Sequence, residues 1–155
     1  MSASSSSRKA FGLTLGILGC GLIGWWGWTQ IGPSDPAPQR FDLALGAEIY
    51  ADQCAACHGV NLEGQTPDWR KRDADGRLPA PPHDETGHTW HHPTEQLFDL
   101  TKYGVAAFAP EGYQSNMPAF EGVLSDMEIR TVLAFIKSQW PAEIQARHDQ
   151  LDARP

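Results

Sequence analysis

The hydrophobic positions divide the chain into an apolar N-terminal run and a mixed remainder that carries short helical patterns. Residues 10–31 contain no charged side chain, and three tryptophans crowd the far end of this run. As a helix the run would span about 33 Å at ~1.5 Å per residue, close to the ~30 Å hydrocarbon core of a bilayer. Two basic residues, Arg8 and Lys9, precede it and favour a cytoplasmic N-terminus. The pattern predicts a cytoplasmic segment over 1–9 and a single transmembrane anchor over 10–31.

A cleaved signal segment is the alternative interpretation of the apolar run. Residues 17–20 faintly resemble a lipoprotein processing site, at which Cys20 would be lipidated and the N-terminus removed. Both interpretations tether the remainder on the outer side of the membrane. Residues 32–40 contain three prolines and predict a short, extended linker that separates the anchor from the domain.

The first helical pattern covers residues 41–56. Phe41, Leu45 and Ile49 recur at i, i+4 and i+8, and Gly46 and Tyr50 lie on an adjoining face. The spacing therefore predicts a helix that buries this apolar stripe and ends close to the next pair of cysteines.

Two more helices are predicted over 93–103 and 125–139. In the first, Pro93 suits the first turn, two leucines (Leu97 and Leu100) face inwards, and Gly104 favours a stop. In the second, Ser125 and Glu128 form a capping box ahead of an apolar stripe. The stripe comprises Ile129, Val132, Leu133 and Ile136.

The segments between the helices are rich in glycine and proline and predict ordered loops over 60–92 and 105–120. After Pro141 the chain has no strong core pattern, and we expect residues 142–155 to form a loosely packed or frayed tail. Residues 41–141 are therefore predicted as one domain of helices and loops.

The charge balance excludes one class of partner. The chain has 12 Lys and Arg against 19 Asp and Glu, a formal charge of −7. Nucleic-acid binding needs clustered basic side chains for phosphate contacts, so an acidic chain is unsuited to it. The same charge suits a protein partner that offers a basic docking surface.

The candidate chemistry lies in Cys54-Ala55-Ala56-Cys57-His58. This C-x-x-C-H pattern is typical of covalent haem c attachment: each thiol forms a thioether to a haem vinyl group, and the following imidazole ligates the iron. A zinc site would need further Cys or His ligands at metal-binding spacing, and no second C-x-x-C exists. A redox dithiol would normally open the helix of a βαβ unit, and no strand pattern precedes the motif.

A haem iron held by His58 has a second axial position, for which the sequence offers several ligands. Met117 stands in a loop directly before Pro118, whose ring limits the conformations of the chain there. Met127 lies in the capping turn of the last predicted helix, where a core or surface role is expected. The remaining candidates are His83, His88, His91, His92 and His148.

These motifs together resemble the class I cytochromes c of the small, bacterial, membrane-anchored kind. The resemblance covers residues 41–141 and rests on three segments. They are Gly46-x-x-x-Tyr50-x-x-x-Cys54-x-x-Cys57-His58-Gly59, then Met117-Pro118-Ala119-Phe120, and Leu124-Ser125-Asp126-x-Glu128-Ile129 with Phe135-Ile136.

The resemblance implies an all-α fold of about three to five helices around one covalently bound haem c. It also implies that the first and last helices cross near Gly46 and Phe135, and that His58 and Met117 are the proximal and distal iron ligands. In such domains a proline carbonyl accepts a hydrogen bond from the proximal imidazole, and Pro79, Pro81 and Pro82 are all candidates.

Two clusters are not explained by the resemblance. Four histidines, His83, His88, His91 and His92, fall within ten residues and could bind copper or zinc, or compete with Met117 for iron. Arg70, Lys71, Arg72 and Arg77 form the basic cluster, which is either a solvated face or a set of partners for the haem propionates.

The leading functional prediction is a single-electron carrier, because two filled axial positions leave the iron no site for oxygen or peroxide. It would sit on the periplasmic side of a bacterial inner membrane and pass electrons between respiratory or periplasmic redox partners. A haem-based sensor or enzyme subunit is one alternative, and a copper-handling accessory that uses the histidine loop is another.

Overall fold

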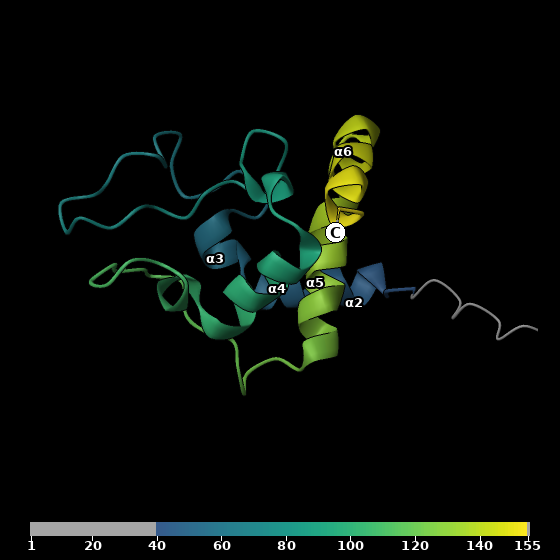
Figure 1. Ribbon diagram of the computed structural model, residues 1–155, viewed down its shortest axis with the longest axis horizontal. Helices are drawn as coiled ribbons and strands as arrows, with labels where there is room; N and C mark the ends of the chain where they lie inside the picture. The colour runs from purple at the N-terminus through teal and green to yellow at the C-terminus, as the bar shows by residue number, and fades with distance from the viewer. Residues whose placement is uncertain (1–39, 155) are drawn as a thin grey trace, which may run out of the picture. The chain divides into compact units, whose positions relative to one another are not determined.

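The computed structural model describes residues 40–154, which fold into helices and long loops (Figure 1). The predicted N-terminal segment, anchor and linker, up to residue 39, lie outside the described residues. No helix within 40–154 has the length and apolar character needed to cross a membrane. The helices are α2 (Leu43–Gln53), α3 (Ala55–His58), η1 (Thr89–His91), α4 (Thr94–Tyr103), η2 (Val105–Ala107), α5 (Asp126–Ser138) and α6 (Ala142–Asp152).

The crossing of α2 and α5 organises the domain, and Figure 1 shows α5 passing across α2. A methyl group at Gly46 would lie 2.7 Å from both Phe135 Cβ and the Thr131 carbonyl oxygen. Only glycine therefore allows the two backbones to approach this closely. The predicted crossing at Gly46 and Phe135 is confirmed.

The core extends from this crossing to the C-terminal helix. Ile129, Val132 and Ile136 of α5 are fully or almost fully buried, as the predicted stripe requires, and Leu133 is half-buried. On α2 the buried positions are Gly46, Ile49 and Tyr50. The larger buried cluster comprises Ile49, Tyr50, Ala55, Leu62, Val132, Ile136, Trp140 and Ile144.

Two helices present a different face to the core from the one predicted. Leu45 is 41% exposed, because α2 turns its Gly46 and Tyr50 face towards α5. In α4 the buried residues are Phe98 and Thr101, whereas Leu97 and Leu100 are half-buried. In both helices the closest approach to α5 decides which residues are buried.

The helix ends follow the predicted capping signals. The Ser125 hydroxyl accepts a hydrogen bond from the Glu128 backbone N–H, and the Glu128 carboxylate accepts one from the Ser125 N–H. This reciprocal pair is the predicted capping box. At the end of α4, Gly104 adopts a φ of 82°, which glycine reaches without steric cost.

The prediction of a loosely packed C-terminal tail is wrong. Residues 142–152 form α6, in which Ile144 and His148 are buried. The helix is mostly polar, but Ile144, His148 and Leu151 share the face that packs on the core and on η1. A stripe this narrow gives little hydrophobic periodicity in the sequence, and a histidine in it does not count as an apolar position.

Candidate functional site

The cysteine–histidine motif occupies the junction of two helices. Cys54 ends α2, and the single turn of α3 carries Ala55 to His58, with the Cys57 and His58 amides both donating to the Cys54 carbonyl. The three-residue spacing places both thiols on one side of this turn. Cys54 is half-buried, Cys57 is exposed and His58 is buried.

The His58 ring is oriented by a backbone acceptor. Its Nδ1 lies 2.8 Å from the Pro81 carbonyl oxygen, and Pro81 is thereby selected from the three candidate prolines. Because a carbonyl only accepts, Nδ1 carries the proton, and Nε2 keeps its lone pair for a metal ion. Carbonyl partners of this kind fix both the tautomer and the direction of a ligating histidine.

The turn after the motif packs on the same prolines. Gly59 (φ 86°) lets the chain leave α3, and the Gly64 N–H donates to the His58 carbonyl at 2.7 Å. A side chain at Gly64 would come within 3 Å of Pro82, so this glycine is required by the close approach of the two segments. The Tyr50 hydroxyl donates to the Gly59 carbonyl at 2.9 Å and closes the turn from the α2 side.

The electrostatics of the motif favour a neutral imidazole and disfavour a reactive dithiol. Burial lowers the pKa of His58, against the opposing effect of its bond to Pro81. Burial, together with the neighbouring Cys57, raises the pKa of the Cys54 thiol to about 11. Redox-active dithiols have lowered pKa values because the thiolate is the reactive form, so the environment of Cys54 is the opposite of theirs.

His83 lies directly against His58. The two rings stack with their centroids 3.9 Å apart and their planes 20° from parallel. Two imidazoles that ligate one iron from opposite sides must lie end-on with the metal between them, so a face-to-face pair cannot do so. In this structure His83 is therefore not a rival of Met117 for the second axial position.

The other histidines of the predicted metal loop do not converge. His91 stacks on Trp90, with ring centroids 3.7 Å apart, and His88 stacks on Trp69 at 4.9 Å. Among these four described rings the only ring contact is that of His88 with His92, whose centroids are 5.4 Å apart. Within residues 40–154, no group of three or more His, Cys, Asp or Glu side chains could hold a metal ion. The expected four-histidine copper or zinc site is thus not assembled.

Two further candidates for the iron have other surroundings. His148 is 1% exposed, its Nε2 donates to the His92 carbonyl at 3.0 Å, and its ring meets the edge of Trp140. Met127 is 52% exposed in the first turn of α5. His148 thus serves the packing of α6, and Met127 lies on the surface as its position in the capping turn suggested.

Met117 stands half-buried in the loop between η2 and α5. The Met117 N–H donates to the Ser115 hydroxyl at 3.1 Å. One residue earlier, Asn116 accepts a hydrogen bond of 2.9 Å from the Arg77 guanidinium, which also reaches Gln114 at 3.4 Å. Arg77 therefore connects the loop that follows the haem motif to the loop that carries Met117.

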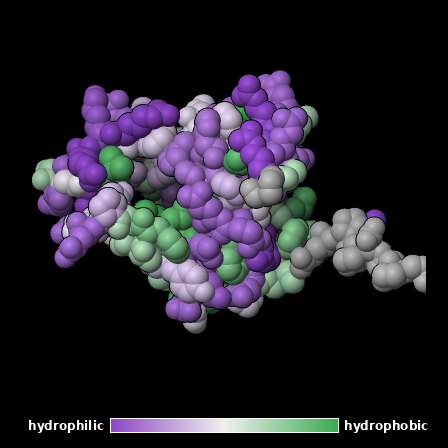
Figure 2. Space-filling model, viewed as in Figure 1, coloured by the Kyte–Doolittle hydropathy of each residue, from purple (hydrophilic) through white to green (hydrophobic). Residues whose placement is uncertain are grey.

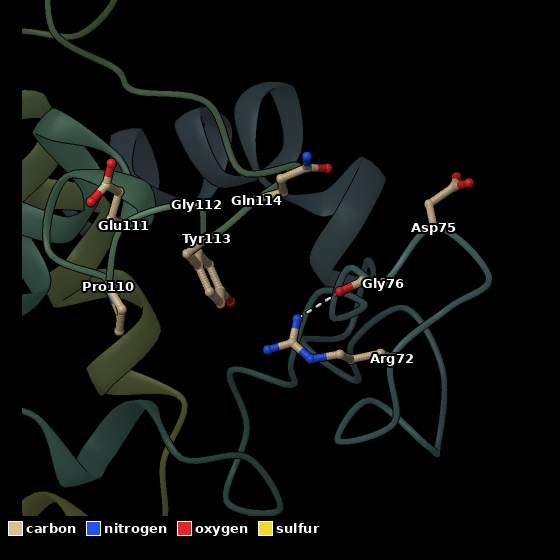
Figure 3. Close-up of a pocket in the computed structure, with 8 residues that line it drawn as sticks. All are labelled: Arg72, Asp75, Gly76, Pro110, Glu111, Gly112, Tyr113 and Gln114. Carbon is tan, nitrogen blue, oxygen red and sulfur yellow. Dashed lines mark hydrogen bonds between the residues drawn. The ribbon is translucent and has the colours of Figure 1, made fainter.

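A cavity of about 460 Å³ lies where these two loops face each other (Figure 3). Arg72 and Tyr113 reach towards one another across it, and Arg72 also donates to the Gly76 carbonyl. The rest of the basic cluster is turned elsewhere: Arg70 lies over Trp69, and Lys71 forms an exposed pair with Asp68. Only Arg72 and Arg77 are thus placed to meet an anionic group between the loops.

Comparison with known proteins identifies the family of this domain. The sequence profile of the cytochrome c family matches residues 43–140. The chain belongs to the cytochrome c family, and its described part is an all-α cytochrome c domain. The family carries covalent haem c, with which the Cys54, Cys57 and His58 motif is consistent. No solved structure matches the chain.

Curated relatives include subunits and domains of larger redox proteins. The chain is 29% identical to a cbb3-type cytochrome c oxidase subunit FixP of Bradyrhizobium over 106 residues, which are 67% of this chain and 32% of the relative. It is 28% identical over 95 residues to a nitrite reductase of Stutzerimonas stutzeri, covering 58% of this chain and 14% of the relative. A thiosulfate dehydrogenase of Stutzerimonas stutzeri is 56% identical over 34 residues, 21% of this chain and 11% of the relative. The chain thus spans about a third or less of the length of these relatives.

Three features near the site were missed by the sequence analysis. They are the stack of His83 on His58, the bond from Trp140 Nε1 to the His83 carbonyl at 2.7 Å, and the cover provided by α6. The histidine cluster was the available signal for the first, but its spacing pointed to a metal rather than to a ring stack. The other two join residues more than fifty positions apart, which no local pattern reveals.

Proposed function

We propose that this protein is a single-electron carrier that binds one haem c through Cys54 and Cys57, with His58 and Met117 as the axial ligands. The observation that carries the proposal is the 2.8 Å bond from His58 Nδ1 to the Pro81 carbonyl. It leaves Nε2 as the free donor of a neutral, buried imidazole, directly next to two cysteines on a single helical turn. This arrangement fits the covalent attachment and the ligation of haem c.

When bound, haem c supplies a one-electron couple at its iron. The chain's residues determine the properties of that couple. The Pro81 carbonyl increases the basicity of His58 and holds its direction. A Met117 thioether as the second ligand would favour the reduced iron and raise the reduction potential. With both ligands supplied by the chain, small molecules must displace one of them to bind.

We further propose that the domain is tethered by residues 10–31 to a bacterial inner membrane, faces the periplasm and serves a respiratory complex. The relatives named as oxidase subunits support this role, as does the formal charge of −7, which suits a basic docking surface. Figure 2 shows mainly hydrophilic residues over the loop that carries the basic cluster, and apolar residues gathered over η2. We expect electron transfer to such a partner to slow as salt is raised.

Replacing Met117 tests the ligand assignment. Absorption spectra of the full-length protein, oxidised, reduced and reduced under carbon monoxide, should show a low-spin haem to which the gas binds only slowly, because it must first displace a ligand. In Met117→Ala we expect a lower reduction potential and prompt carbon monoxide binding, with Met127→Ala as the matched control that keeps the parent behaviour. A parent protein that binds the gas at once would contradict the carrier assignment. A Met117→Ala variant with the parent's potential and carbon monoxide behaviour would contradict the assignment of Met117 as a ligand.

A further inference from the structure

His83, which stacks on the proposed proximal ligand His58, has no role in the electron transfer proposed above. His83 lies face to face with His58, with centroids 3.9 Å apart and planes 20° from parallel. It cannot be the opposite axial ligand, and it shares no metal cluster with the other histidines of its loop. Its contact with the iron ligand therefore needs another explanation.

His83 is itself held from several sides. Its ring Nδ1 lies 2.8 Å from the Thr89 hydroxyl oxygen, and its backbone N–H donates to the Leu62 carbonyl at 2.8 Å. Its carbonyl accepts the hydrogen bond from Trp140 Nε1 at 2.7 Å, and the Tyr50 ring meets its edge at 6.3 Å. Backbone and ring are both fixed, so the plane of His83 is defined by the fold.

A ligating imidazole has two orientational freedoms that matter. The direction of Nε2 is set by the Pro81 carbonyl, but one hydrogen bond still lets the ring swing about that axis. A parallel ring at stacking distance prevents the swing, because any rotation would drive the two planes into each other. The plane of an axial imidazole governs how its orbitals meet those of the iron, and outer partners are known to tune this.

We propose that His83 is a positioning residue that fixes the ring plane of His58, and that Thr89 in turn fixes the plane of His83. This inference rests on the proposed function, since it takes His58 as the iron ligand. Thr89 is 5% exposed, and its hydroxyl lies 3.5 Å from the Pro82 carbonyl. It is therefore anchored on the loop segment that also carries Pro81. Thr89, His83 and His58 form one chain of contacts that ends at the proposed iron ligand.

The test is electron paramagnetic resonance of the oxidised, full-length haem protein, together with its reduction potential. In His83→Ala we expect a shifted and broadened low-spin signal, because the His58 ring samples several planes, while carbon monoxide binds no faster than to the parent. His83→Phe keeps a flat ring against His58 and should restore a narrow line. Thr89→Val keeps the shape of the side chain but removes its hydroxyl, with the bonds to His83 and to the Pro82 carbonyl, and should give a smaller shift in the same direction.

His91→Ala is the matched control, since His91 stacks on Trp90 in the same loop, is exposed, and among the described residues makes no ring contact with His83 or His58. It should leave the signal unchanged. A His83→Ala spectrum identical to that of the parent would overturn the inference while leaving the proposed function intact. If His83→Ala does not accumulate as a haem protein, Thr89→Val decides: an unshifted signal there would overturn the inference equally. A parent protein without a low-spin signal would instead overturn the proposed function.

Discussion

The two sides of the candidate haem site are built very differently. On the His58 side, residues 79–93 are bonded to α3, to Trp140 just after α5 and to α6, and three of these loop residues are buried. On the Met117 side, no residue from 105 to 119 is buried. The side-chain hydrogen bonds that link the Met117 loop to the rest of the domain come mainly from Arg77. The His58 side is held by three long-range hydrogen bonds, which involve Pro81, Trp140 and His148.

The contrast indicates that the two proposed iron ligands differ in mobility. A ligand fixed by several buried bonds keeps its geometry through both redox states, which lowers the reorganisation needed for electron transfer. A ligand on a loop with few buried contacts opens locally at low cost. We therefore expect displacement of a ligand, when it occurs, to take place at Met117.

Trp140 should show the largest effect on stability. It is 3% exposed, packs in the core cluster and donates to the His83 carbonyl. Trp140→Ala should lower the free energy of unfolding by about 3–5 kcal/mol, and Trp140→Phe, which loses the hydrogen bond but keeps most of the ring, by about 1–3 kcal/mol. Urea unfolding of the full-length haem protein measures both.

Trp90→Phe is the control for that series. Trp90 is half-buried and its Nε1 makes a longer bond of 3.3 Å to the Glu85 carbonyl. We expect Trp90→Phe to lower the free energy of unfolding by less than Trp140→Phe does. Equal losses would mean that α5 and α6 do not secure the His58 side in the way the bonds indicate.

His148, on the His58 side of the site, should make the stability of the domain sensitive to acid. Its burial, and secondarily Lys137, lowers the pKa of His148 despite the nearby Asp152 carboxylate. The unfolded chain therefore binds a proton more readily near its ordinary pKa of about 6.5. The stability should be constant above that pH and fall below it, by at most about 1.4 kcal/mol per pH unit for this one proton, until the folded-state pKa is passed.

Unfolding measured in urea between pH 8 and pH 5 checks this dependence. The parent should lose stability through the acid half of the range, and His148→Gln, which retains a donor for the His92 carbonyl, should lose less. Should the two curves run parallel, the acid sensitivity belongs to other groups, such as His88, whose pKa burial also lowers.

Arg77 should produce the smallest change in stability but a distinct change at the iron. Arg77→Ala removes the bonds to Asn116 and Gln114 that hold the Met117 loop. Losing about 0.5–1.5 kcal/mol of such bonding should speed carbon monoxide binding to the reduced protein by roughly 2- to 10-fold. Stopped-flow mixing measures the rate.

Lys71→Ala is the matched control for Arg77. Lys71 pairs only with Asp68 on an exposed part of the same loop, and such pairs contribute less than about 1 kcal/mol. The carbon monoxide rate should stay at the parent value. A rate increase in both variants would point to a general effect of charge rather than to release of the Met117 loop.

Much of the site was predictable because its chemistry is encoded locally. The spacing of Cys54, Cys57 and His58 requires no knowledge of the fold, and the capping box of Ser125 and Glu128 lies within one turn. Gly46 was predicted to lie at a helix crossing only through the family resemblance, since a lone glycine in a helical pattern has several explanations. The helix of residues 142–152 was missed because its buried stripe is narrow and includes a histidine.

The sequence by itself determined the covalent haem motif, the helical pattern of the domain and its acidic charge, because each depends on residues close together in the chain. Only the tertiary structure decided that Pro81 orients His58, that His83 stacks on that ligand, and that Trp140 and His148 hold the loop from the other side. Those contacts join residues far apart in the sequence. A histidine also looks the same in the sequence whether it binds a metal, packs in a core or stacks on another ring. Which of these roles it takes depends on which neighbours the fold brings within a few ångströms.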